Sequence, residues 1–262
     1  MQFLDTFYAF VLLFLLPNLS YAETHQINKS ACCDLPSIKV NNQHHWYIDL
    51  GLGWVFNMKD YNVYVNHSDA PPDLYLPNGS NNTIILALSG GYNWFFDHDW
   101  LPAASLGIEY SYLPKSNNNG QIAQFSDPGA INYDYAYKTE HNSISLLGEL
   151  AIYRWNQVMP FLLAGIGNSW NDIDAYQESP LPGITPRISP DFSNGSRSAW
   201  KYTLGFGFDY QPIPNLLLAL SYRYNEFNKG ASGTGFATFA NEKLRDKSYA
   251  NLLMLNARYL FA

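Results

Sequence analysis

The sequence predicts an all-β fold, an eight-stranded antiparallel up-and-down transmembrane β-barrel. Three observations lead to it. Segments of about ten residues alternate between large apolar and small or polar side chains, which gives a strand two unlike faces. Only 14% of the 262 residues are charged, against roughly 25% in a typical soluble domain. Aromatic residues make up 16% of the chain. So little charge cannot cover a surface that faces water.

The clearest segment is residues 200–210, where every even position is large and every odd position is glycine, threonine or ionisable. Its length matches the roughly 9–11 residues with which a tilted strand crosses a bilayer. Counting matches to this pattern predicts eight strands. They span residues 46–56, 83–94, 103–112, 141–153, 160–170, 200–210, 216–225 and 249–261.

Taken in order, the first four segments set leucine, isoleucine and aromatic residues against glycine, alanine, serine or a carboxylate. The fifth is the weakest, because Phe161 and Leu163 blur its alternation. The sixth is the clearest one. The seventh and eighth return to leucine and tyrosine on one face, with Arg223 and Arg258 on the other. An even number of strands is what an up-and-down bacterial barrel needs in order to close.

Connection lengths alternate as well. Short turns are expected around residues 97–99, 155–157 and 212–214, and long loops at 57–82, 114–140, 171–198 and 226–248. Outer-membrane barrels keep short turns in the periplasm and long loops outside the cell. We therefore expect both termini in the periplasm and one barrel domain, residues 45–262, with four long extracellular loops.

The N-terminus predicts export. Residues 7–16 form an apolar run, and Ser20-Tyr21-Ala22 is a small-x-small cleavage site, so residues 1–22 are interpreted as a signal peptide. The n-region carries Asp5 and lacks Lys and Arg, which departs from the usual pattern. Residues 23–44 would form a polar periplasmic tail. A membrane anchor is disfavoured, because it needs about 20 apolar residues.

The formal net charge of −7 argues against nucleic acid as a partner. Cys32 and Cys33 are the only cysteines, and adjacent cysteines bridge each other only under strain. A free or intermolecularly paired state in the tail is expected, and their role stays open. We expect no metal site and no cofactor, because the histidines are scattered and structural zinc wants four ligands.

Alternation alone also fits a soluble lipocalin-like barrel with its apolar face inside. Two observations favour the membrane. The small face is dominated by glycine, serine and alanine, which suits the narrow lumen of eight strands. Aromatic residues gather near both strand ends, as interfacial girdles do. The predicted girdle comprises Trp46, Trp54, Tyr92, Trp94, Tyr110, Tyr112, Tyr153, Trp170, Trp200, Tyr210, Tyr222, Tyr224 and Tyr259.

These strands, the final segment 255–261 and the stretches Ser89-Gly90-Gly91-Tyr92 and Ala164-Gly165-Ile166-Gly167 resemble small outer-membrane β-barrels. The OmpA-like transmembrane domain and the opacity-protein group are similar over residues 45–262. The resemblance implies the bacterial outer membrane, a monomer, and recognition by the barrel assembly machinery through Tyr259 and Phe261. Family members usually end on that aromatic residue, whereas this chain continues to Ala262.

Seven ionisable residues should face the lumen in two layers of mixed sign. Unpaired charges there are costly, so ion pairs that plug the interior are expected, with a narrow ion-selective pore as the alternative. Strand closure should bring Arg258 near Asp49. The expected network comprises Glu109, Lys201 and Arg223 in the outer layer, and Asp49, Glu149, Asp209 and Arg258 in the periplasmic layer.

An enzyme is the third alternative, because some barrels of this membrane modify lipid A with a His/Ser pair. His141 and Ser143 share a face with Glu149, but that face points into the lumen, away from acyl chains.

The leading hypothesis is a non-enzymatic barrel that contributes to envelope structure and contacts a host or surface ligand through its loops. Outer-membrane lipid is a further expected partner, with lipopolysaccharide as a candidate at Lys243, Arg245 and Lys247.

Overall fold

The computed structural model describes residues 43–60, 62–66, 68, 70–78 and 81–261. The predicted signal peptide, most of the predicted tail and both cysteines lie outside the described residues. Among the residues described, no helix is long and apolar enough to span a membrane.

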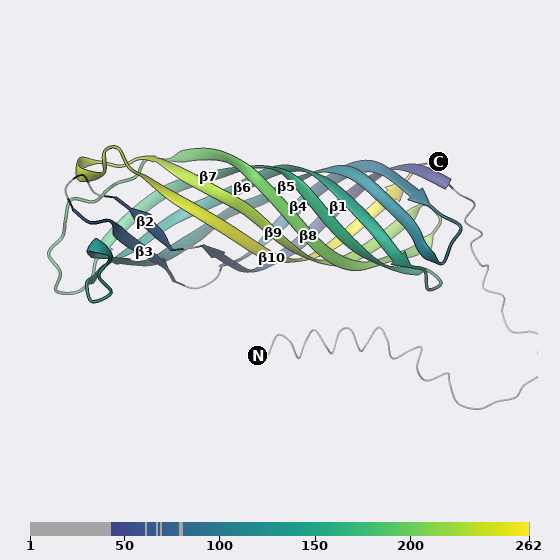
Figure 1. Cartoon of the computed structure of the whole chain (residues 1–262), viewed down its shortest axis with the longest axis horizontal. Helices are drawn as coiled ribbons and strands as arrows, with labels where there is room; N and C mark the ends of the chain where they lie inside the picture. Colours follow the sequence, from purple (N-terminus) through teal and green to yellow (C-terminus); the bar gives the residue numbers. More distant parts are fainter. Residues whose placement is uncertain (1–42, 61, 67, 69, 79–80, 262) are drawn as a thin grey trace, which may run out of the picture. The chain divides into compact units, whose positions relative to one another are not determined.

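Eight long antiparallel strands form a closed barrel, drawn side by side along one axis in Figure 1. Each strand pairs with its neighbours in the series, and β10 pairs with β1 to close the ring. The predicted eight-stranded antiparallel barrel is therefore confirmed. The strands are β1 (Gln43–Asp60), β4 (Asn81–Phe95), β5 (Trp100–Ala123), β6 (Ile131–Tyr153), β7 (Val158–Pro180), β8 (Gly195–Ile213), β9 (Leu216–Thr234) and β10 (Lys243–Leu260).

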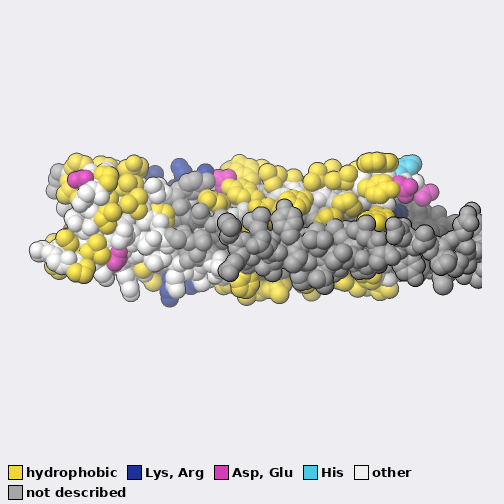
Figure 2. Space-filling model, turned by 90° about the horizontal axis from the view of Figure 1, so that it is seen from below, with side chains coloured by type: hydrophobic (Ala, Val, Ile, Leu, Met, Phe, Trp, Pro, Cys, Tyr) yellow, Lys and Arg dark blue, Asp and Glu magenta, His cyan; other side chains and the backbone are white. Residues whose placement is uncertain are grey.

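The two faces of the barrel wall have the predicted orientation. Leu204 is 60% exposed on the outside, whereas Arg223, on the small face, is only 5% exposed. Figure 2 shows hydrophobic side chains covering a broad band of the outer surface. A soluble barrel with an apolar core and a charged exterior is excluded over this band.

The barrel has two unlike ends. The connections β4–β5, β6–β7 and β8–β9 are tight, and they share one end, the short-turn end, with the C-terminus (Figure 1). The opposite end, the long-loop end, carries a hairpin of β2 (Val63–Val65) and β3 (Asp73–Pro77) and the 3-10 turns η1 (Gln124–Ser126) and η2 (Ala237–Phe239). β3 pairs with the far end of β5, which lengthens the wall there.

The predicted extents of the long loops are wrong. Much of 114–140, 171–198 and 226–248 is strand, because β5, β6, β7, β9 and β10 continue well beyond the hydrophobic band. On β6 the reason is visible: Tyr133, Tyr135 and Tyr137 point inward and are buried, while Asp134 and Lys138 are exposed. Beyond the membrane band, the wall thus encloses an aromatic core and presents polar residues outside, as a soluble barrel does.

This aromatic core is built from several elements of the long-loop end. Its residues come from the β2–β3 hairpin, from β5, β6, β7 and β10, from η2, and from residues 181–194, which we call the strap. Phe192 of the strap packs edge-on against Tyr176, with ring centroids 5.0 Å apart. The core comprises Val65, Tyr75, Ile122, Tyr133, Tyr135, Tyr137, Ile173, Tyr176, Phe192, Phe239 and Leu244.

Candidate functional site

The lumen near the short-turn end is organised around Arg258 of β10. Its Nε donates to Asp49 Oδ2 at 3.2 Å, and its two terminal nitrogens reach the two Glu149 oxygens at 3.1 Å each. The guanidinium also lies over the Tyr47 ring, 4.6 Å from the centroid. Antiparallel pairing sets Asp49 directly opposite Arg258, so closure of the barrel creates this ion pair.

A second ion pair lies further along the lumen. Arg223 Nη1 donates to Glu109 Oε2 at 2.7 Å, across the barrel interior from β9 to β5. Asn256 joins the two pairs, because it accepts from Arg223 Nη2 at 3.3 Å and donates to Asp49 Oδ1 at 2.8 Å. The two layers are therefore one hydrogen-bonded network, and the asparagine that connects them is missing from the sequence prediction.

Lys201 and Asp209 are buried in the lumen, but the predicted ion pairs do not include them. Lys201 Nζ donates to Ser111 Oγ and Ser143 Oγ at 2.9 Å each. Among the described contacts, neither residue has an oppositely charged partner within salt-bridge distance. Lys201 lacks a carboxylate partner because Glu109 is already paired with Arg223. Its ammonium group donates to the nearby serine hydroxyls instead.

Apolar layers separate the polar ones. At the short-turn end Tyr47, Phe161, Leu163 and Leu217 belong to a buried cluster, and Phe227, Met254 and their neighbours form another beyond the ion pairs. The inward face of β6 shows the whole sequence of layers, and every one of its side chains is buried. From the short-turn end it runs Ala151, Glu149, Leu147, Ser145, Ser143, His141, Thr139, Tyr137, Tyr135 and Tyr133.

His141 and Ser143 both face the lumen, as their spacing predicts, but they have different partners. The His141 ring lies 2.8 Å from Asn171 Oδ1 through Nδ1 and stacks on Phe227 at 4.6 Å. Ser143 Oγ lies 2.6 Å from Ser111 Oγ and accepts from Lys201. A serine nucleophile needs a base that takes its proton. No described hydrogen bond joins Ser143 to His141, whose Nε2 has no partner among the described residues.

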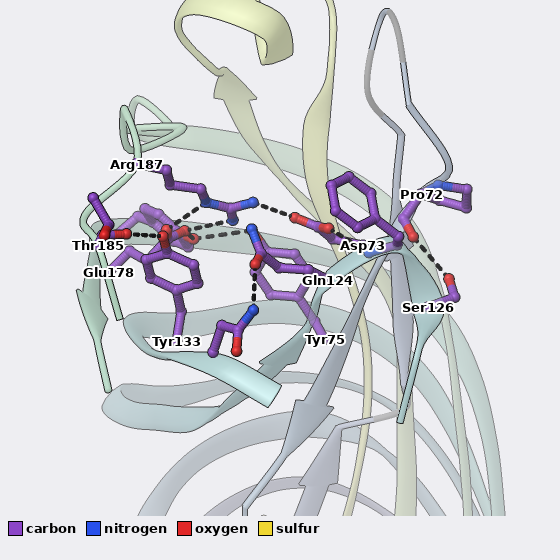
Figure 3. Close-up of polar contacts among 12 residues, drawn as sticks. Pro72, Asp73, Tyr75, Gln124, Ser126, Tyr133, Glu178, Thr185 and Arg187 are labelled. Carbon is purple, nitrogen blue, oxygen red and sulfur yellow. Dashed lines mark hydrogen bonds and ion pairs between the residues drawn. The ribbon is translucent and has the colours of Figure 1, made fainter. Parts of the chain in front are cut away.

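At the long-loop end, a buried charge cluster centres on Arg187 of the strap (Figure 3). Its Nη1 donates to Asp73 Oδ2 at 2.6 Å, and its Nε donates to Glu178 Oε1 at 2.7 Å. The side chains of Asp73 and Glu178 are almost completely buried, at 0% and 2% exposure. Arg187 therefore ties the strap both to β3 and to β7.

Aromatic rings enclose this cluster. The Arg187 guanidinium lies 4.8 Å from the Tyr133 ring centroid and 5.3 Å from that of Phe239. Tyr133 donates its hydroxyl proton to the backbone oxygen of Thr185, also in the strap. Burial lowers the pKa of Arg187, but hydrogen bonds and charge from Glu178, then Asp73, outweigh it and raise that pKa above its ordinary value.

Two tyrosines lie beside the charge cluster. They are Tyr75 of β3 and Tyr176 of β7, and their hydroxyl oxygens are 3.0 Å apart. Burial raises the pKa of both phenols well above the ordinary value of 10.0. Sequence analysis does not predict this site. A single arginine in a loop carries no periodicity, and Asp73 lies 114 positions away.

The predicted girdle residues all point outward, and none of them is buried. Several contact one another, as Trp46 does with Tyr92 at 5.0 Å. Tyr259 and Phe261, the predicted assembly signal, are also outward and in contact at 5.1 Å. On β10 the residues Lys243 and Arg245 are exposed and Lys247 is partly exposed, while the intervening Leu244 and Asp246 are buried. No trio of His, Cys, Asp or Glu in the described ranges is placed to hold a metal ion.

Residues 18–249 match the family model described as the outer membrane protein beta-barrel domain. The match spans most of the chain, and it agrees with the closed ring, the outward apolar band and the packed lumen. The chain belongs to this family and is a protein of the bacterial outer membrane. No curated protein matches the sequence.

Solved structures that match this chain include the following three proteins. Neisserial surface protein A (NspA) is 16% identical, with a TM-score of 0.42, and the alignment covers 82% of this chain and 97% of that one. OprG from Pseudomonas aeruginosa is 14% identical, with a TM-score of 0.44, and 83% and 96% are covered. The protease OmpT from Escherichia coli is 11% identical, with a TM-score of 0.40, and 83% and 97% are covered.

Proposed function

We propose that this protein is a non-enzymatic barrel of the bacterial surface, with a closed lumen, that supports the envelope and recognises a host or surface ligand at its long-loop end. The observation that carries the proposal is the filled interior. Arg258, Arg223 and their partners cross the lumen, and apolar layers lie on both sides of them. A water-filled channel usually needs about 16 strands.

The long-loop end faces the outside of the cell in this proposal, because short turns are the periplasmic feature of such barrels. Ile188 and Phe236 are then displayed to the surroundings at 68% and 65% exposure. They are held in place, since Arg187 anchors the strap and the Phe236 amide donates to the Pro190 oxygen at 2.6 Å. Rigid apolar anchors bind at low entropic cost, which supports a recognition surface.

Planar-bilayer recording of the refolded protein tests the closed lumen. We expect no steady channel events from the unmodified protein. Arg223→Ala, which removes one side of the 2.7 Å pair with Glu109, should introduce or raise conductance. Lys115→Ala, outside the lumen, is the matched control and should stay silent. Steady currents from the unmodified protein, reduced by Arg223→Ala, would overturn the proposal.

A narrow pore is the second candidate, and one observation favours it. The lumen around Lys201 contains polar atoms without a hydrogen-bond partner among the described residues, on Ser145, Thr203 and Asn225. Such atoms are usually satisfied by water. The same bilayer recording separates this candidate from the closed barrel.

A lipid-modifying enzyme is tested by mass spectrometry of lipid A from cells with and without the protein. An unchanged spectrum is expected, because Ser143 is hydrogen-bonded to Ser111 and Lys201 and no described hydrogen bond joins it to His141. Outward Tyr259 and Phe261 are proposed as the contact for the barrel assembly machinery, and the assembled protein is proposed to be a monomer.

A further inference from the structure

The outer wall of the barrel is unevenly charged just beyond the hydrophobic band. Lys229 of β9 and Lys243, Arg245 and Lys247 of β10 lie on two paired strands. All four side chains are exposed or partly exposed, because the residues between them on β10 turn inward. We call these four residues the basic strip. Sequence analysis finds only its β10 half, since Lys229 joins it through strand register.

Two cations of the basic strip face each other across the β9–β10 pair. Lys229 stands directly opposite Lys247 in the β9–β10 register. Like charges at opposed positions of an antiparallel pair destabilise the sheet. Glu226 pairs with Lys247 at 2.8 Å, but no ion pair is found for Lys229, Lys243 or Arg245 among the described contacts. Three of the four cations of the basic strip are therefore available to bind an anion.

The outer face of β5–β7 also carries two cations beyond the hydrophobic band, but carboxylates lie beside them. Lys115 pairs with Asp174 at 2.5 Å, and Lys138 stands opposite Asp174 in the β6–β7 register. Glu140 and Asp172 face each other nearby. Two cations there accompany three carboxylates, whereas the four cations of the basic strip have two carboxylates beside them, Glu226 at Lys247 and Glu242 next to Lys243 in the chain. An anion drawn to the barrel wall would prefer the β9–β10 side.

The position of the strip decides what kind of anion it suits. The ring centroids of Tyr224 and Tyr249 lie 5.8 Å apart, at the edge of the apolar band nearest the long-loop end. Lys247 precedes Tyr249 by two residues, or about 7 Å along the strand, and Arg245 precedes it by four, or about 13 Å, both toward the long-loop end. Aromatic rings lie at the boundary of hydrocarbon and water, so these cations stand at the level of lipid headgroups. Figure 2 shows dark-blue side chains at the top and bottom edges of the view, between the hydrophobic band and the long-loop end.

We propose that the basic strip binds the phosphate groups of a phosphorylated glycolipid of the outer leaflet, the chemistry that lipid A of lipopolysaccharide presents. The acyl chains would lie on the apolar face of β9 and β10, and the phosphates would contact Arg245 and the opposed pair Lys229 and Lys247. Arginine holds phosphate through two parallel hydrogen bonds, and lysine adds point charge. The inference rests on the proposed function, because it needs the long-loop end to face outward.

Native mass spectrometry of the folded barrel with bisphosphorylated lipid A in detergent tests the inference. Lys243→Gln with Arg245→Gln removes two charges from the strip, and Lys115→Gln with Lys138→Gln removes two from the β5–β7 wall. Each cation near an anionic surface changes binding about fivefold, so the strip variant should bind about 25-fold more weakly. The control pair should stay within about twofold of the unmodified protein, because three carboxylates surround these two cations and Lys115 is already paired with Asp174.

Dephosphorylated lipid A provides the second measurement, and it should bind the unmodified protein about as weakly as intact lipid A binds the strip variant. Equal losses in both variants, or no difference between the two lipids, would overturn the inference. So would a soluble polysulfate that binds the strip as tightly as lipid A does. Channel currents would overturn the proposed function instead, and leave the lipid result standing.

Discussion

Asp49 and Arg258 stand directly opposite each other on β1 and β10, although 209 positions separate them in the chain, and their side chains form an ion pair of 3.2 Å. The pair exists only when the first and last barrel strands meet. Arg258 also holds Glu149 from the far side of the lumen. Closure of the ring and neutralisation of the buried carboxylates are thus a single event.

Replacement of Arg258 tests this coupling. Arg258→Met would leave Asp49 and Glu149 buried without their cation, and breaking such a pair costs about 3–5 kcal/mol. We expect a lower urea midpoint for unfolding in detergent. Heat-modifiable gel migration measures the folded fraction at each urea concentration. Lys115→Met, which breaks an exposed pair with Asp174, serves as control and should leave the midpoint unchanged. Equal midpoints for both variants would contradict the coupling.

Gly107 tests how tightly the lumen wall is packed. A side chain added there would collide with the Tyr47 hydroxyl and with the Gly90 carbonyl oxygen, the latter at 2.8 Å from the new carbon. Gly107→Ala should therefore lower the yield of folded barrel and destabilise it by about 1–3 kcal/mol, the usual cost of overpacking. Gly148→Ala is the matched control, because its nearest neighbours would be 4.0 Å away. Refolding yield on a gel compares the two, and equal yields would exclude tight packing at Gly107.

Arg187 should determine whether the strap stays folded. Arg187→Met leaves Asp73 and Glu178 buried without a cation, so residues 181–194 should open locally. We expect proteinase K to cut the strap at least about tenfold faster, while the barrel keeps its folded gel migration. Lowering the free energy of local opening by about 3 kcal/mol would allow an even larger increase in the cleavage rate. Arg245→Met, at an exposed site, controls for the loss of a positive charge. Unchanged cleavage would show that the aromatic core alone holds the strap.

Alkaline pH should open the same region. The folded state raises the phenol pKa of Tyr75 and Tyr176 above 10.0, the value expected in an unfolded chain, chiefly through burial. The folded state therefore holds these protons more tightly, and its stability is fully present below pH 10 and falls as pH rises above 10. Phenolate absorbance at pH 11 should show at least two fewer ionised tyrosines in folded than in denatured protein. In Tyr75→Phe with Tyr176→Phe, that difference should decrease by two.

The number and faces of the strands could be predicted because lipid imposes one rule on every segment that crosses it. Leu204, Gly205 and Phe206 alternate as that rule requires. The extensions obey a different rule, since Tyr133 and Tyr135 turn inward where water replaces lipid outside. In the extensions the apolar residues face inward and the polar residues face outward. The pattern that identifies the membrane strands therefore predicts a loop there.

The candidate sites were predictable only where register decides them. Pairing of β1 with β10 places Asp49 beside Arg258, and closure alone predicts that. Asn256 and Lys201 depend on side-chain reach inside the lumen, which alternation does not describe. Arg187 depends on the path of the strap, and nothing local in its sequence specifies which carboxylates it will meet.

The lengthened wall also sets how far the long-loop tip stands from the hydrophobic band. β5 continues for eleven residues past Tyr112, the last girdle residue on that strand. At a rise of about 3.3 Å per residue and a tilt of about 40°, this adds roughly 25–30 Å of height. With the long-loop end outside the cell, as proposed, Ile188 and Phe236 would stand on this extension at a distance from the bilayer, where a large partner could reach them.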